Sequence, residues 1–292
     1  MSSASSAPDV TAIHHEGHLQ GRGGKRLFWQ SWLPEGDRDP NAILVIAHGA
    51  AEHSGRYRYV VEKLVPEDFG VYALDHRGHG RSEGARAQLD RMSSVVADLD
   101  QLVDLARHEH PGRKVFLLGH SMGGTIAVTY ALSHQEKLDG LALSAPLAAI
   151  DAAPLPLRIL ARTLSLVAPG VGILRIEGGA VSRDPQEVRA YENDPLVYRG
   201  KLPARTVQEL ADTIGAFPHS VPDLTLPLLV MQGTADGLVP PAGARLVHDG
   251  AGATDKTLKT YEGYFHELFN EPPEEREVPL NDLAGWLRAR AG

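Results

Sequence analysis

The sequence predicts an α/β protein with a mostly parallel central sheet flanked by helices. Short, continuously apolar runs alternate with amphipathic stretches along most of the 292 residues. Strands that are apolar at every position are typical of parallel sheets covered on both faces. The composition agrees, because 42% apolar and 23% charged residues are close to the averages for globular domains. The chain has no cysteine, which excludes disulfide bonds, thiolate metal sites and a cysteine nucleophile.

The predicted elements follow one another in order. Residues 1–11 are mainly small and polar, and we expect a flexible tail there. Helical spacing is clearest in Ser94–Ala106, where apolar residues share one side and Asp98, Asp100 and Asp104 are expected to point away from it. Strands are predicted at Arg26–Leu33, Ala42–Ala47, Val71–Leu74, Val115–Leu118, Leu141–Leu143, Leu228–Met231 and Leu258–Tyr261. The other helices are predicted at Arg56–Leu64, Thr125–Leu132 and Leu280–Arg288.

One segment interrupts this alternation. Between residues 147 and 222 no β/α repeat is visible, and Leu155–Ile176 is rich in apolar side chains. This stretch is expected to be divided into short helices by Pro154, Pro156, Pro169 and Gly170. We therefore expect residues 147–222 to form a helical cap inserted between two strands, and residues 12–146 together with 223–292 to form the core.

Charge and hydropathy restrict the partners. The 29 basic and 37 acidic residues give a net charge of −8, which disfavours a nucleic-acid-binding domain. No apolar run reaches the roughly 18 residues of a membrane-spanning helix. The first ten residues lack the basic and apolar regions of a signal peptide. We expect a soluble, cytoplasmic protein, with peripheral contact at membranes as a second option.

The strongest local motif is Gly119-His120-Ser121-Met122-Gly123. It lies between a predicted strand and a predicted helix, where glycines permit a tight turn that exposes the serine. A serine hydroxyl is a weak nucleophile until a base removes its proton. The alternative interpretation is a glycine-rich turn with an incidental serine.

Fourteen histidines compete for the role of base. His266 is favoured because it follows the last predicted strand, and the loops at the carboxyl ends of parallel strands form the ligand-binding crevice. Asp236 follows the preceding strand, which completes the chain order serine, aspartate, histidine. Its alternative role is that of a helix N-cap or turn residue. For the oxyanion, the expected donors are the backbone amides of Ala50 and Met122.

Taken together, these motifs resemble the monoacylglycerol lipase branch of the α/β-hydrolase superfamily. The resemblance implies an α/β-hydrolase fold, a mobile cap over an apolar acyl tunnel, and hydrolysis of monoacylglycerols through an acyl-enzyme. It implies no metal and no organic cofactor. The segments that carry it are His48–Tyr57 (HGAAEHSGRY), Asp75–Ser82 (DHRGHGRS), Gly119–Gly124, Asn193–Leu196 (NDPL) and Tyr261–Gly263 (YEG).

The resemblance also implies that Glu52, Arg56 and Tyr191 hold the glycerol head group. Glu52 and Arg56 could equally form an ordinary i, i+4 ion pair, and Tyr191 could simply pack within the cap. Some relatives carry a second histidine three positions after the catalytic one, where this chain has Phe269. Asp75 and Arg77 are expected to brace their loop rather than to act in catalysis.

The expected partner is a lipid ester substrate. We also expect transient contact of the cap with a membrane or micelle surface, with Arg158 and Arg162 near the lipid head groups. The alternative is a cap whose apolar side only packs over the sheet. Runner-up functions are a lysophospholipase or broad carboxylesterase with the same triad, and a ligand receptor with a vestigial triad. No oligomeric state is predicted.

Overall fold

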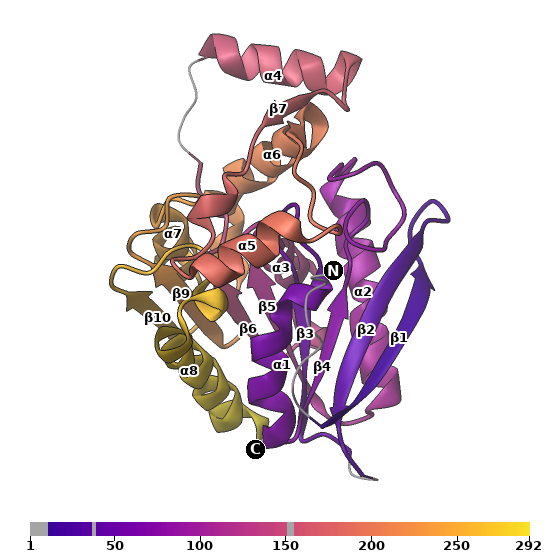
Figure 1. Cartoon of the computed structure of the whole chain (residues 1–292), viewed down its shortest axis with the longest axis vertical. Coiled ribbons are helices and arrows are strands. Elements are labelled where there is room, and N and C mark those ends of the chain that lie inside the picture. The colour runs from indigo at the N-terminus through magenta and orange to yellow at the C-terminus, as the bar shows by residue number, and fades with distance from the viewer. Residues whose placement is uncertain (1–10, 37–38, 151–154) are drawn as a thin grey trace.

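An eight-stranded sheet forms the centre of the protein (Figure 1). The structure, a computed structural model, describes residues 11–36, 39–150 and 155–292, so residues 1–10 of the expected tail lie outside it. In this sheet β2 pairs antiparallel with both β1 and β4, and all other pairs are parallel. The strand order is β1 (Ala12–Gln20), β2 (Arg26–Pro34), β4 (Phe69–Leu74), β3 (Ala42–Ala47), β5 (Lys114–His120), β6 (Gly140–Ser144), β9 (Leu228–Gly233) and β10 (Lys256–Tyr261).

Helices cover both faces of this sheet and bury two apolar layers. On one face, α1 (Arg58–Leu64) and α8 (Pro273–Ala291) pack against the strands. The opposite face is covered by α2 (Met92–Glu109), α3 (Met122–His134), α6 (Ala204–Ser220) and α7 (Ala242–Gly250). The strands β3, β4, β5 and β6 are buried at almost every position, which explains why they are apolar throughout. The predicted α/β class with a mostly parallel sheet is confirmed.

The structure differs from the sequence prediction at the amino-terminal edge. β1 was not predicted, because its sequence AIHHEGHLQ has few apolar residues and most of its side chains are exposed or only partly buried. An edge strand without a buried face lacks the hydrophobic alternation that identifies strands. The helix α7 was not predicted either.

The expected outward orientation of Asp98 is wrong. Its side chain is fully buried on α2, where the Nε and Nη2 atoms of Arg77 donate hydrogen bonds to its two carboxylate oxygens at 2.6 and 2.8 Å. The backbone amide of Arg22 donates a third at 3.0 Å. A buried carboxylate is tolerated when it is paired in this way, so charge alone was a poor guide to which side of the helix Asp98 occupies.

The segment between β6 and β9 contains α4 (Leu155–Val167), β7 (Gly172–Leu174), α5 (Pro185–Asn193), β8 (Leu202–Pro203) and α6. Pro156 lies in the first turn of α4, where a helix tolerates proline, and it does not divide the segment as expected. Pro154 lies outside the described residues. In Figure 1, α4 and β7 stand above the sheet, while α5 crosses in front of it. We propose that this segment is the cap. Within the described ranges, no helix is both long enough and apolar enough to cross a lipid bilayer.

Candidate active site

Ser121 occupies the tight turn between β5 and α3. Its backbone has a φ of 53° and a ψ of −121°, a region that residues other than glycine rarely adopt and that often marks a functional site. A Cβ atom at Gly123 would overlap the carbonyl oxygen of Ala47 on β3, so only glycine fits at that position. The local sequence therefore fixes the turn that raises Ser121 above the sheet.

His266 and Asp236 meet beside this turn although they come from different loops. The Nδ1 atom of His266 donates a hydrogen bond to Asp236 Oδ2 at 2.8 Å, and both side chains are almost fully buried. The other carboxylate oxygen, Oδ1, accepts from the amides of Leu238 and Val239 at 2.9 and 3.0 Å. Asp236 thus combines the turn role with the contact to His266. Burial alone raises the pKa of Asp236, but hydrogen bonds from His266 and these amides outweigh it and leave the pKa below its usual value.

One cavity of about 460 Å³ joins the predicted residues. Ser121 and His266 both line it. Because Nδ1 of His266 is engaged by Asp236, Nε2 is the ring nitrogen available to the hydroxyl of Ser121. The remaining walls are mostly apolar, and several belong to the segment between β6 and β9, including Leu174, Ile176, Leu202 and Leu210.

The turn after β3 borders the same cavity through Gly49 and Ala50. The backbone amide of Gly49 donates a hydrogen bond to Glu52 Oε1 at 2.5 Å, and this bond holds the turn after β3 in place. On the other side of Ser121, α3 begins at Met122, and the first amides of a helix have no acceptor within the helix. Ala50 and Met122, whose backbone amides are the expected oxyanion donors, therefore belong to the turn and the helix that border Ser121.

His120, which directly precedes Ser121 in the motif, contacts the His266 ring with 4.7 Å between ring centroids. Burial, together with the proximity of His266, lowers the pKa of His120 to about 3. This ring is therefore neutral near pH 7. It supports the imidazole of His266 without adding a charge.

Glu52, Arg56 and Tyr191 lie together where the main cavity adjoins a smaller one, which forms its polar end. Arg56 Nε lies 3.4 Å from Glu52 Oε2, so the i, i+4 ion pair is confirmed. The guanidinium group also lies 4.8 Å from the centroid of the Tyr191 ring. Glu52 and Tyr191 line the main cavity, whereas Arg56 lines a small cavity beside it. Glu267 was not predicted from the sequence, although its position directly after His266 was an available signal. Its carboxylate accepts a hydrogen bond from Arg56 Nη2 at 2.5 Å.

Comparisons with known proteins agree with this arrangement. Residues 38–273 match the family described as "Serine aminopeptidase, S33". The chain is 41% identical over 279 residues to the monoacylglycerol lipase of Mycolicibacterium smegmatis, covering 95% of this chain and 98% of the relative. It is 38% identical over 275 residues to the human monoglyceride lipase, covering 94% and 90%. The crystal structure of the monoacylglycerol lipase of Paleococcus ferrophilus superposes with a TM-score of 0.78 at 28% identity, covering 96% and 100%.

The chain belongs to the monoacylglycerol lipase branch of the α/β-hydrolase superfamily. It is therefore an enzyme, a carboxylic ester hydrolase of the lipase class. The match extends along nearly the whole chain, including the segment above the sheet. The resemblance drawn from the sequence motifs is confirmed.

In this lipase-family chain, Asp75 and Arg77 brace the loop after β4. Asp75 Oδ1 accepts from the amide and the hydroxyl of Ser54 at 2.8 and 2.6 Å, and Oδ2 accepts from the amide of Arg81 at 2.8 Å. Arg77 pairs with Asp98 on α2. Neither residue lines the main cavity, so the expectation of a bracing role is confirmed.

Proposed function

We propose that the chain is a serine hydrolase that cleaves the ester bond of monoacylglycerols to a fatty acid and glycerol. The observation that carries the proposal is one cavity, lined by Ser121 and His266, with apolar walls and a polar end. The apolar walls suit an acyl chain and the polar end suits a small head group. The names of the relatives from Mycolicibacterium smegmatis and human support this substrate class.

In the first half of the reaction, His266 Nε2 accepts the hydroxyl proton of Ser121 as the serine oxygen attacks the ester carbonyl carbon. The carbonyl oxygen becomes an oxyanion, which the amides of Ala50 and Met122 stabilise. Each such donor is worth about 2.7–4 kcal/mol of transition-state stabilisation in related chemistry. The ester bond then breaks, and His266 returns the proton to the departing glycerol oxygen.

In the second half, a water molecule gives a proton to His266 and attacks the acyl-enzyme carbonyl. The bond to Ser121 breaks, the fatty acid leaves, and His266 returns the proton to the serine. Asp236 stays ionised throughout, because its pKa lies below the usual value. Its charge fixes the tautomer of His266 and stabilises the imidazolium that forms in each half. No metal or organic cofactor enters this scheme.

For the head group, we propose that Glu52, Arg56 and Tyr191 bound the subsite for glycerol. The two side chains that line the main cavity, Glu52 and Tyr191, offer oxygen atoms to hydroxyl groups. Arg56 holds Glu52 in place through their ion pair. Hydroxyl groups of glycerol would then meet polar atoms while the acyl chain extends along the apolar walls.

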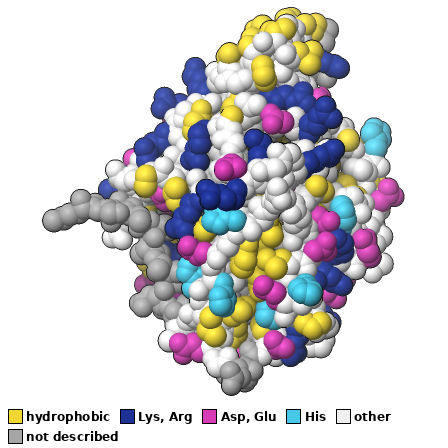
Figure 2. All heavy atoms as spheres, turned by 90° about the vertical axis from the view of Figure 1, so that its right-hand side faces the viewer, with side chains coloured by type: hydrophobic (Ala, Val, Ile, Leu, Met, Phe, Trp, Pro, Cys, Tyr) yellow, Lys and Arg dark blue, Asp and Glu magenta, His cyan; other side chains and the backbone are white. Residues whose placement is uncertain are grey.

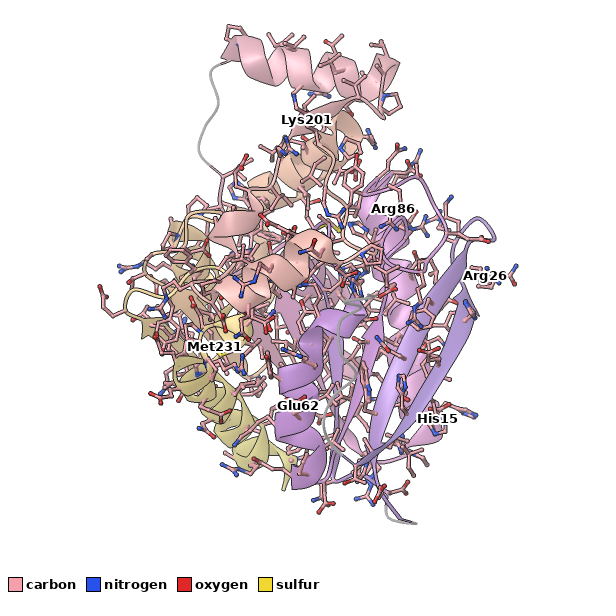
Figure 3. All side chains as sticks on the ribbon, in the orientation of Figure 1. His15, Arg26, Glu62, Arg86, Lys201 and Met231 are labelled. Carbon is pink, nitrogen blue, oxygen red and sulfur yellow. The ribbon has the colours of Figure 1, made fainter. Side chains whose placement is uncertain are left out.

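We also propose that α4 meets lipid surfaces transiently and that the protein is cytoplasmic. Large apolar side chains are exposed on and next to α4, among them Leu166 and Val167 at 71% and 73%. Figure 2 shows hydrophobic side chains over the top of the molecule with Lys and Arg side chains below them. Lys201 lies below α4 (Figure 3), and Arg162 is exposed on α4 itself; the side chain of Arg158 is not among those described. Apolar and basic groups together suit the boundary of a bilayer.

A substrate panel tests the proposed function. We expect higher kcat/KM for a monoacylglycerol than for di- and triacylglycerols or lysophosphatidylcholine of the same chain length. A preference for lysophosphatidylcholine would replace the substrate assignment with a lysophospholipase, and equal rates on all esters would indicate a broad carboxylesterase. A fluorophosphonate probe that leaves Ser121 unlabelled would indicate a receptor with a vestigial triad.

A further inference from the structure

Glu267 is a buried carboxylate that the reaction scheme above does not use. It follows His266 directly, its side chain is 6% exposed, and it lines the main cavity. It also lines the small adjoining cavity, together with Arg56 and Phe269. Its backbone is held because the amide donates to the carbonyl of Val181 at 2.7 Å. A charged group so close to the reacting centre calls for a functional explanation.

The two carboxylates at this end of the cavity have acceptor capacity to spare. Glu267 Oε2 accepts from Arg56 and from Asn270 Nδ2 at 2.5 and 2.8 Å, while Oε1 has no hydrogen-bond donor among the described residues. Glu52 Oε1 accepts from the Gly49 amide and the Tyr57 hydroxyl, while within the described part of the chain Oε2 faces only Arg56 Nε, at 3.4 Å. One oxygen of each carboxylate is therefore left for a ligand.

Charge at this end is also unbalanced. Two carboxylates, Glu52 and Glu267, share the single guanidinium of Arg56. Burial raises the pKa of Glu267, but Arg56 outweighs this effect and keeps the pKa below its usual value. Burial and the nearby charge of Glu267 raise the pKa of Glu52. A site with surplus negative charge disfavours an anionic head group such as a phosphate, and it favours neutral donors.

We propose that Glu267 is a specificity-determining residue that accepts a hydrogen bond from one hydroxyl of a vicinal diol, while Glu52 accepts from the other. The inference rests on the proposed function and names the part of the alcohol that this site recognises. The group that Glu267 and Glu52 recognise is an uncharged 1,2-diol on the leaving alcohol. A histidine at position 269 could contact a substrate hydroxyl group, as the sequence of some relatives allows. Phe269 has no polar side-chain atom and cannot make that contact. Glu267, on the same small cavity, supplies a hydroxyl acceptor instead.

The first test uses the wild-type protein and three esters of one fatty acid, with glycerol, 1,2-propanediol or 1-propanol as the alcohol. We expect kcat/KM to be highest for the glycerol monoester and lowest for the propyl ester. A hydrogen bond to a charged group is worth roughly ten- to hundredfold in this ratio. Equal kcat/KM on all three esters would leave the proposed function standing and overturn the role of Glu267. No hydrolysis of any of them would instead overturn the proposed function.

The second test compares Glu267→Gln with a matched control, Glu187→Gln. Glu187 is also buried and ion-paired, with Arg58 Nη2 at 2.8 Å, but it lines neither of the two cavities at the site. We expect E267Q to lower the glycerol-to-propyl ratio of kcat/KM by roughly ten- to hundredfold, and E187Q to keep the wild-type ratio. A proportional fall on both esters in E267Q would show a merely structural role and overturn the proposal. Should E267Q not fold, Glu267→Asp is measured in its place, and a wild-type glycerol-to-propyl ratio in that variant would overturn the proposal.

Discussion

Replacing Asp236 by asparagine should invert the hydrogen bonding of the catalytic imidazole. The backbone amides of Leu238 and Val239 both donate to Oδ1 of Asp236 and cannot turn over. Gln232 Nε2 donates to Oδ2 at 3.0 Å, but this side-chain amide can rotate and present its oxygen, which has no hydrogen-bond partner in the part of the chain that the structure describes. The side-chain oxygen of an asparagine therefore takes the position of Oδ1. Its NH₂ group then takes the place of Oδ2 and faces His266 Nδ1, 2.8 Å away in the wild type. Because an NH₂ group donates, Nδ1 must become an acceptor and the proton moves to Nε2. That tautomer cannot accept the proton of Ser121.

The expected loss is large because the base is removed while the fold remains. In the well-studied serine protease triad the same substitution lowers kcat by about 10⁴, which corresponds to about 5.5 kcal/mol of transition-state stabilisation. We expect a similar fall here for hydrolysis of a monoacylglycerol, measured by released fatty acid. Asp100→Asn is the control, since Asp100 pairs with Lys137 at 2.7 Å and does not line the cavity. A D236N enzyme within tenfold of wild-type kcat would refute this reasoning.

Three further perturbations test other parts of the account. Gly123→Ala should abolish turnover and lower the melting temperature, because a Cβ there overlaps the backbone of β3; an active, equally stable variant would contradict the steric argument. Burial lowers the pKa of His76 to about 3 and of His79 to about 4, from 6.5. The unfolded chain therefore binds more protons below pH 6.5, and the free energy of unfolding should fall by about 2 kcal/mol per histidine near pH 5; equal stability by urea unfolding at pH 7.5 and 5 would disprove this. Replacing Leu166 and Val167 together by serine should weaken vesicle binding by about tenfold in sedimentation, since the exposed apolar area is lost, and unchanged binding would remove α4 from the proposed lipid contact.

The sheet and the loops that hold Ser121, Asp236 and His266 could be predicted from the sequence, because each leaves a pattern within a short stretch of residues. A strand such as Ala42–Ala47 is buried at every position and is therefore apolar at every position. The turn around Ser121 requires glycine at positions where a side chain would collide, which leaves a visible motif. The position of Asp236 and His266 after successive strands follows from the way parallel strands align their carboxyl ends.

Other features could not be predicted, because they depend on contacts between segments far apart in the chain and no short sequence pattern marks them. β1 is an exposed edge strand, so its residues are not selected for a buried face. Asp98 is buried because Arg77, 21 positions away, pairs with it. Glu267 could be assigned to the head-group end of the cavity only once the ion pair with Arg56, 211 positions away, was known. Such long-range pairings are a property of the folded chain rather than of any sequence window.

The central claim, that His266 activates Ser121 as the nucleophile, is tested most directly by covalent labelling. The wild-type protein is incubated with a long-chain alkyl fluorophosphonate, digested, and analysed by mass spectrometry. We predict a single phosphonyl adduct on the peptide that contains Ser121, formed rapidly in the wild type and at least about a thousandfold more slowly in His266→Ala. An adduct on another residue, or equal labelling rates in the two proteins, would contradict the claim.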